Sequence, residues 1–300
     1  MLYLSNYLTH METPFDLLKI IASFVTIPKM KLLDWIDQDD LDISGLSDNP
    51  NAGLFLETFL KNSKEEEEGE LIDWYSLSSN PGAIHILEAN FDMIEWSYLS
   101  SNPNGMALLE SNPEKIDWVM LSSNPNGIAL LESNPEKIDW ASLSSNPNGI
   151  SLLESNPEKI NWLLFSANPN GIHMLESVLQ ESETNPNPNS NPNPNPHKKI
   201  YWDLLSANPN AIHILEANQD KIDWANLSSN PNGIPLLESN PEKINWNGLS
   251  SNPNGIHLIK ANQDKIGCNF SMNPSIFEID KTQLDIDIKN KAKQIDWAIL

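Results

Sequence analysis

Residues 134–155 of this 300-residue chain read NPEKIDWASLSSNPNGISLLES, and this 22-residue stretch decides the fold because it recurs along most of the chain. Successive tryptophans lie 22 residues apart in two series, Trp74, Trp96, Trp118, Trp140 and Trp162, then Trp202, Trp224 and Trp246. Cys268 lies a further 22 residues after Trp246 and replaces the tryptophan. Ile43 and Trp297 hold the same position in an earlier and a later copy, once extra segments of nine and seven residues are allowed for. A fixed period of this length is typical of solenoid proteins, in which each repeat packs against its neighbours.

Each repeat has two halves of 12 and 10 residues, and both halves open with Asn-Pro. Asparagine is a preferred helix N-cap, proline suits the first helical position, and the residue before proline avoids the α region. The strongest apolar residues are three apart, which puts one stripe on a short helix. The repeat therefore predicts two helices of about eight residues, each starting at an Asn-Pro pair, whose indoles and aliphatic side chains form the core.

These features favour an all-α fold, an elongated, right-handed α-solenoid of short two-helix repeats, with a leucine-rich-repeat-like solenoid as the alternative. Residues 41–300 form the predicted array of ten full repeats, followed by an eleventh that stops at Leu300. Its insertions lie near 61–70, 177–198 and 275–293, and the second is an extended Asn-Pro tract. Residues 1–40 are predicted to form a helical cap whose segment Pro14–Phe24 weakly resembles an F-box, and Met11 is an alternative start.

Charge limits the classes of partner. The chain has 41 Asp and Glu against 18 Lys and Arg, a formal net charge of -23, which repels nucleic-acid backbones and anionic membranes. It lacks an apolar run of about 18 residues, so we expect no membrane span. A single cysteine, Cys268, excludes an internal disulfide, fits a reducing compartment, and is expected to be a small buried side chain.

The sequence offers no catalytic constellation. It has no Gly-rich phosphate loop, no His-Glu-x-x-His and no Gly-x-Ser-x-Gly, so we expect no enzyme, no cofactor and no metal. His173 and His213 lie in consecutive repeats, so they could approach one another, but a metal site would need further ligands. Carboxylates that recur in every repeat, such as Asp139 and Glu154, indicate a structural role, since an active site needs its residues once.

Positions that vary between repeats are free of the packing constraint and are the expected partner-facing surface. One set follows the tryptophans, and the other follows the isoleucine that begins the second apolar stripe. The candidates are Tyr75, Tyr98, Met120, Leu164 and Asp203 in the first set, and His85, His173, His213 and His257 in the second.

The motif Lys-Ile-Asp-Trp-x-x-Leu-Ser-x-Asn-Pro-Asn-(Gly/Ala)-Ile-x-Leu-Leu-Glu-x-Asn-Pro is carried almost unchanged by residues 221–240. It resembles repeats in large paralogous sets encoded by giant DNA viruses, over about residues 41–300. The resemblance implies a viral protein of the infected cell, in the host cytoplasm or in the virion, without an established activity.

The function predicted from these features is a non-catalytic protein-interaction scaffold whose partners are unknown proteins, host proteins included. The alternatives are a substrate-recruiting adaptor of a ubiquitin ligase, through the F-box-like segment, and an RNA-binding helical repeat protein, against which the acidic charge speaks.

Overall fold

The computed structural model describes residues 19, 22–23, 26, 28–62, 72–184 and 198–299. The chain divides into two compact units: Asp40–Ser275, called the repeat array below, and a terminal unit formed by Met1–Asp39 and Ile276–Leu300. Helices predominate, and the described residues contain only two strands of three residues each. The predicted all-α solenoid of two-helix repeats is confirmed, and the leucine-rich-repeat-like alternative is wrong because it needs a strand in every repeat.

Each of the first nine repeats contains two α-helices, and a 3-10 turn usually leads to the next repeat. The first helices are α3 (Ile43–Ser47), α6 (Trp74–Ser79), α8 (Trp96–Ser101), α10 (Trp118–Ser123), α12 (Trp140–Ser145), α14 (Trp162–Phe165), α16 (Trp202–Ala207), α18 (Trp224–Ser229) and α20 (Trp246–Ser251), with the 3-10 turn η10 (Phe270–Met272) at the equivalent place in the tenth repeat. The second helices are α4 (Gly53–Asn62), α7 (Ile84–Ala89), α9 (Met106–Ser111), α11 (Ile128–Glu132), α13 (Ile150–Ser155), α15 (Ile172–Thr184), α17 (Ile212–Ala217), α19 (Ile234–Ser239) and α21 (Ile256–Ala261).

The helices do not begin at the Asn-Pro pairs, which corrects the sequence-based prediction. In the fourth repeat, α10 begins at Trp118 because the Asp117 side chain accepts hydrogen bonds from the backbone N–H groups of Val119 and Met120. The following Asn-Pro pair forms a turn, and the pair after that opens the 3-10 turn Pro135–Lys137. The Asn-Pro pairs still interrupt the helices, but the caps of most first helices are aspartates or asparagines one residue before the tryptophan position.

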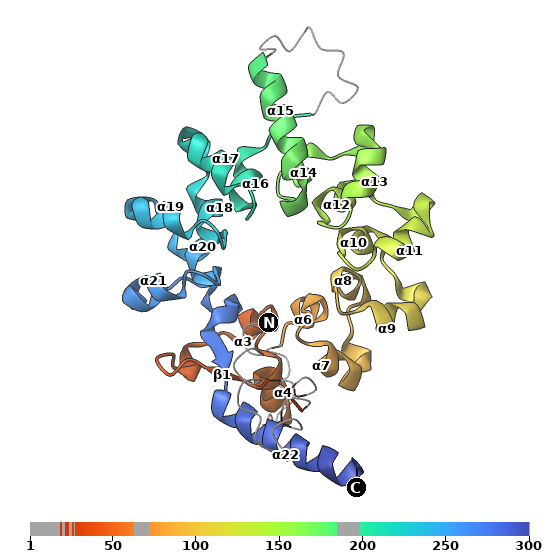
Figure 1. Cartoon of the computed structure of the whole chain (residues 1–300), viewed down its shortest axis with the longest axis vertical. Coiled ribbons are helices and arrows are strands. Elements are labelled where there is room, and N and C mark those ends of the chain that lie inside the picture. The colour runs from red at the N-terminus through yellow and green to blue at the C-terminus, as the bar shows by residue number, and fades with distance from the viewer. Residues whose placement is uncertain are drawn as a thin grey trace. The chain divides into compact units, whose positions relative to one another are not determined.

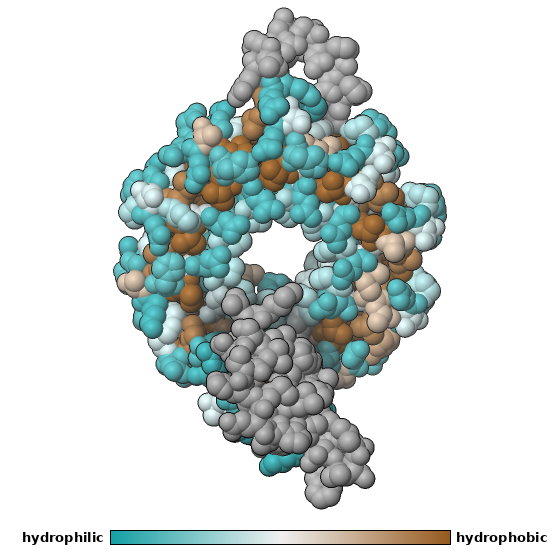
Figure 2. All heavy atoms as spheres, in the orientation of Figure 1, coloured by the Kyte–Doolittle hydropathy of each residue, from teal (hydrophilic) through white to brown (hydrophobic). Residues whose placement is uncertain are grey.

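The two helices of a repeat pack through leucine side chains that have no exposed surface, such as Leu121 of α10 and Leu131 of α11. Figure 2 shows hydrophobic residues as a band between the inner and outer helices of the array. The phased tryptophans border this band: Trp162 is buried, Trp74, Trp96, Trp118, Trp140, Trp202, Trp224 and Trp246 are partly buried, and the side chain of Trp297 lies outside the described residues. Leucine therefore fills the centre of the core, and tryptophan covers its edge.

Neighbouring repeats are joined by a buried asparagine, the one that ends each first helix. Asn124 Nδ2 donates to Ser100 O at 3.0 Å and to Asn102 O at 2.8 Å, both in the preceding repeat, while its Oδ1 accepts from Asn126 N at 2.9 Å. The pattern recurs at Asn49, Asn80, Asn102, Asn124, Asn146, Asn168, Asn208, Asn230, Asn252 and Asn273. We call this set the asparagine ladder.

A buried serine adds a second link between repeats. Ser122 Oγ accepts from Asp139 N of the following repeat at 3.0 Å and donates to Trp118 O at 2.8 Å. A backbone N–H is bound in the same way by Ser47, Ser78, Ser100, Ser122, Ser144, Ser166, Ser206, Ser228, Ser250 and Ser271. Each link satisfies a backbone group that would otherwise be unpaired in the interior.

Both sets of links close on themselves, so the repeat array is a ring. Asn49 of the first repeat donates to Ser271 O at 2.9 Å and to Asn273 O at 2.8 Å, both in the tenth repeat. Asp42 N donates to Ser271 Oγ at 2.8 Å. Figure 1 shows the first helices on the inside of this ring and the second helices on its outside. The prediction of an elongated solenoid is therefore wrong for residues 40–275, because a small rotation at each identical interface accumulates until the ends meet.

The terminal unit does not continue the repeat. Strand β1 (Met30–Leu32) pairs antiparallel with β2 (Phe277–Ile279), with Met30 opposite Ile279. Residues Lys281–Ile299 form one 19-residue helix, α22. The predicted insertion at 275–293 thus contains β2 and the first part of α22, and the helix continues through residue 297, where the eleventh copy of the tryptophan position lies. Most of the F-box-like segment, residues 14–24, lies outside the described residues, as do 63–71 and 185–197 within the other two insertions.

Candidate functional site

The inner wall of the ring is formed by the first helices, and their residue pattern determines what they expose. On a helix with 3.6 residues per turn, the buried leucine and the linking serine mark the side that faces the core and the next repeat. The opposite side carries the first, second and fifth residues after the tryptophan position. We call these positions the inner wall; in α10 they are Val119, Met120 and Ser123.

Four of five consecutive repeats carry large apolar or aromatic residues on the inner wall. Tyr75 is 54% exposed, Val119 52%, Tyr98 40% and Leu163 40%, whereas Met120 and Leu164 are partly buried. The rings of Tyr75 and Tyr98 meet edge to face, with centroids 5.3 Å apart. These residues lie on α6, α8, α10 and α14, and α12 contributes the smaller Ala141. We call the part of the wall from α6 to α14 the apolar arc.

The next three repeats carry mostly polar or small residues at the equivalent positions. Asp203, Ala225 and Asn247 are exposed, and Leu204 and Asn226 are partly buried. Figure 2 shows an opening through the array whose rim is mainly hydrophilic in this view. The residues of the inner wall thus differ between α6–α14 and α16–α20, although the backbone that supports them is repeated.

The charges on the inner wall of the described repeats are negative. Asp48 and Asp203 occupy inner-wall positions, and no lysine, arginine or histidine does so between α3 and α20. Burial raises the pKa of the Asp48 carboxyl, and the nearby Asp73 carboxylate adds to the rise, while a hydrogen bond with Ser76 opposes it. A carboxylate that is partly deprived of water attracts a cationic partner more strongly than a fully solvated one.

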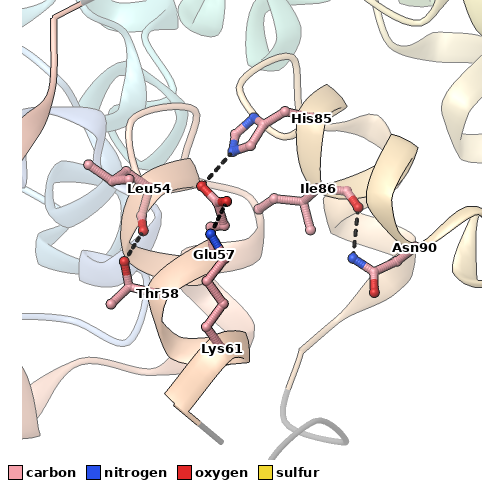
Figure 3. Close-up of polar contacts among 7 residues, drawn as sticks. All are labelled: Leu54, Glu57, Thr58, Lys61, His85, Ile86 and Asn90. Carbon is pink, nitrogen blue, oxygen red and sulfur yellow. Dashed lines mark hydrogen bonds and ion pairs between the residues drawn. The ribbon is translucent and has the colours of Figure 1, made fainter.

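The four candidate histidines lie on the second helices, away from the inner wall. His173 Nε2 is 2.9 Å from Glu154 Oε1, and His257 Nε2 is 3.0 Å from Glu238 Oε1. His213 Nε2 is 2.8 Å from Glu176 Oε1, so His173 and His213 each contact a glutamate of the preceding repeat. Figure 3 shows the same arrangement at α4 and α7, where His85 points toward Glu57. The variable positions therefore fall on two surfaces, the inner wall and an outer rim of His–Glu pairs.

The tryptophans are covered by lysines of the following repeat. Lys137 Nζ lies 4.2 Å from the centroid of the Trp118 ring, and Lys159 Nζ lies 4.3 Å from that of Trp140. Equivalent contacts occur at Trp202, Trp224 and Trp246. A cation over the face of an indole is attracted by the ring quadrupole, so these lysines stabilise the repeat interface.

Cys268 is exposed, contrary to the prediction of a buried side chain. The tenth repeat has one residue fewer between the tryptophan position and the ladder asparagine, Asn273, than the fourth repeat has between Trp118 and Asn124. Phe270 takes the core place that leucine holds elsewhere, and Cys268 is left outside it.

The sequence reasoning did not identify the linking roles of the asparagines and serines. Their signal was available, because both residue types recur in every repeat at fixed positions. Helix capping also accounts for asparagines that recur before proline. The structure shows instead that their side-chain amides donate to the preceding repeat.

A comparison with protein families gives a match over part of the chain. Residues 47–191 match the family described as NosD, periplasmic copper-binding protein. The match covers less than half of the chain, and no curated protein and no solved structure matches. Among the residues that the structure describes, no three His, Cys, Asp or Glu side chains are grouped so that they could hold a metal ion, so they do not fit a copper site. Of the described helices, 19-residue α22 included, none combines the length and apolar character of a membrane span.

Proposed function

We propose that this protein is a non-catalytic scaffold that binds other proteins through the variable positions of its repeats. The observation that carries the proposal is the exposure of Tyr75, Tyr98, Val119 and Leu163 on one wall of a ring whose backbone is held by repeated buried links. Large apolar residues that gather on a surface mark interaction sites in soluble proteins, and aromatic anchors contribute much of the binding free energy at such sites.

The rigidity of the ring supports the same proposal. Each ladder asparagine and each linking serine is buried, so the helices that display the variable residues are fixed relative to their neighbours. A partner that binds a pre-organised surface does not have to bear the cost of ordering it.

The repeat motif supports a viral origin, so we propose that the scaffold acts inside the infected host cell, with the virion as the second place to look. The experiment is affinity purification of the tagged full chain from infected cells, followed by mass spectrometry. Two variants provide the controls: Tyr75→Ser with Tyr98→Ser on the inner wall, and His173→Ser with His257→Ala on the outer rim. Serine or alanine already occupies equivalent positions in other repeats, for example Ser97, Ser142, Ser151 and Ala129, so the variants should fold.

We expect at least one protein to be retained by the intact chain and lost from one of the two variants. If every protein recovered with the intact chain is recovered equally with both variants, the proposal fails.

The ubiquitin-ligase adaptor stays a prediction, because its residues lie largely outside the described part of the chain. Its test is binding of the full chain to a Skp-type adaptor, which a Leu17→Asp, Leu18→Asp variant should abolish. The RNA-binding alternative predicts a change in tryptophan fluorescence on addition of RNA at low salt, where electrostatic binding is strongest.

A further inference from the structure

The inner wall differs from the rest of the ring in both polarity and charge. Its apolar arc runs over α6, α8, α10, α12 and α14, and carboxylates lie on either side of this arc, Asp48 before it and Asp203 after it. The whole repeat array contains 31 Asp and Glu against 11 Lys and no Arg. The wall thus presents an apolar strip inside a strongly acidic body.

Most of the described lysines of the array make contacts of their own. Lys137, Lys159, Lys221, Lys243 and Lys265 lie over indole rings, and Lys61 contacts Glu57. These lysines lie at the repeat interfaces and on the outer helices and do not neutralise the carboxylates at the ends of the apolar arc. An acidic surface of this kind attracts and orients basic partners and repels acidic ones.

We propose that the apolar arc binds a single linear segment of a basic protein, in which aliphatic or aromatic side chains alternate with lysines and arginines. This inference rests on the proposed function and specifies its partner. The segment places its apolar side chains against Tyr75, Tyr98, Val119 and Leu163, and its cations face Asp48, Asp203 and the surrounding acidic surface.

The asymmetry of the wall selects one segment rather than a symmetric ligand. Large apolar residues occupy four of five neighbouring repeats, whereas the following repeats carry Asp203, Asn226 and Asn247. A ligand that repeated its contacts around the ring would have to bury these polar groups against apolar ones, which is unfavourable. The Tyr75–Tyr98 pair forms the broadest aromatic surface of the arc and is therefore the expected anchor.

The test is selection of a displayed library of random 16-residue peptides on the intact full-length chain. We expect the enriched peptides to have an excess of lysine and arginine and to contain aliphatic or aromatic residues. The dissociation constant of an enriched peptide should rise about 10- to 100-fold in the Tyr75→Ser, Tyr98→Ser variant, as at other aromatic anchors. It should also rise with salt and should not change in the His173→Ser, His257→Ala variant.

The outcomes separate the two claims. Enriched peptides that are neutral or acidic, or whose affinity survives the inner-wall substitutions, overturn this inference and leave a protein-binding scaffold standing. If no peptide is enriched and affinity purification also recovers no variant-sensitive partner, both claims fail. Circular dichroism of the inner-wall variant, matched to that of the intact chain, ensures that a loss of binding is not a loss of folding.

Discussion

The asparagine ladder leads to a prediction that separates inter-repeat links from ordinary surface hydrogen bonds. Asn124 and Asn126 lie in one turn, and both Nδ2 groups donate to the preceding repeat. Asn124 is completely buried and makes two such bonds, whereas Asn126 is exposed and makes one, to Pro103 O at 2.8 Å. Changing each residue to alanine removes the same chemical group from two very different environments.

The expected cost follows from the groups that lose their partners. In Asn124→Ala, Asn102 O keeps its bond from Gly105 N at 3.0 Å, but Ser100 O loses the Asn124 amide and Asn126 N loses its side-chain acceptor. Lost bonds cost about 1 kcal/mol each and a deprived buried carbonyl about 1–3 kcal/mol, so the free energy of unfolding should fall by about 3–5 kcal/mol. Asn126→Ala should cost about 0.5–1.5 kcal/mol, because water replaces the lost bond.

Urea unfolding followed by far-ultraviolet circular dichroism gives both free energies. The same substitution at Asn49 extends the test to ring closure. In a closed ring Asn49→Ala loses bonds to Ser271 and Asn273 and should cost as much as Asn124→Ala, whereas in an open solenoid Asn49 would have no preceding repeat to bind. The reasoning is refuted if Asn124→Ala is no more destabilising than Asn126→Ala.

Three further contacts of the repeat can be tested by single substitutions, measured by the free energy of unfolding or by the thermal midpoint. Ser122→Ala should cost about 1–2 kcal/mol because Asp139 N loses its acceptor, whereas Ser123→Ala removes only a local bond to Met120 O and should have less than half of that effect. Asp48→Ser should raise the thermal midpoint at pH 7: the raised pKa means that the folded state binds the proton more readily than the unfolded state, so stability falls as the pH rises. The gain from Asp48→Ser should shrink as the pH is lowered through the ordinary aspartate range; an unchanged gain would contradict the pKa argument. Lys137→Met keeps the aliphatic stem over Trp118 but removes the charge, and should lower the free energy of unfolding by about 0.5–1 kcal/mol; no change would mean that the cation contributes nothing.

The period, the fold class and the two-helix repeat could be predicted from the sequence because they depend on spacing. Apolar residues three apart in Ile138–Ser155, broken by Asn-Pro, allow a helix and disfavour a strand. The starting points of the helices were not predictable in the same way, because aspartate and asparagine are both good N-caps and both precede apolar residues in repeats such as the fourth. The structure assigns the cap to Asp117 and the link between repeats to Asn124.

Closure could not be predicted because curvature is a property of the interface and not of the pattern. A small rotation per repeat is compatible with an open superhelix or with a ring, and the sequence alone does not fix its value. The degenerate first and tenth repeats kept the residues that closure needs, Asp42, Asn49, Ser271 and Asn273, although both lost tryptophan. The differences of these two repeats from the motif therefore leave intact the hydrogen bonds that close the ring.

The candidate surface could be predicted in part. Variation after the tryptophan position correctly indicated exposed residues such as Tyr75, Tyr98 and Asp203, but Met120 and Leu164 are partly buried. The position of the four histidines also varies between repeats, yet it lies on the second helices, where each histidine contacts a glutamate. Variation alone cannot distinguish two surfaces, since both are free of the packing constraint.

A disulfide between the first and tenth repeats would test ring closure most directly. A Cβ atom at Gly45 would lie 3.1 Å from Ser271 Cβ, slightly closer than the spacing of about 3.5–4.5 Å in disulfides. In a Cys268→Ser background, we predict that Gly45→Cys with Ser271→Cys forms an intrachain disulfide in the monomer under mild oxidation, detected by mass spectrometry of the intact chain. Gly45→Cys with Ser144→Cys, the equivalent serine of the fifth repeat, should stay reduced. Free thiols in the first pair, or disulfides between chains only, would contradict the closed ring.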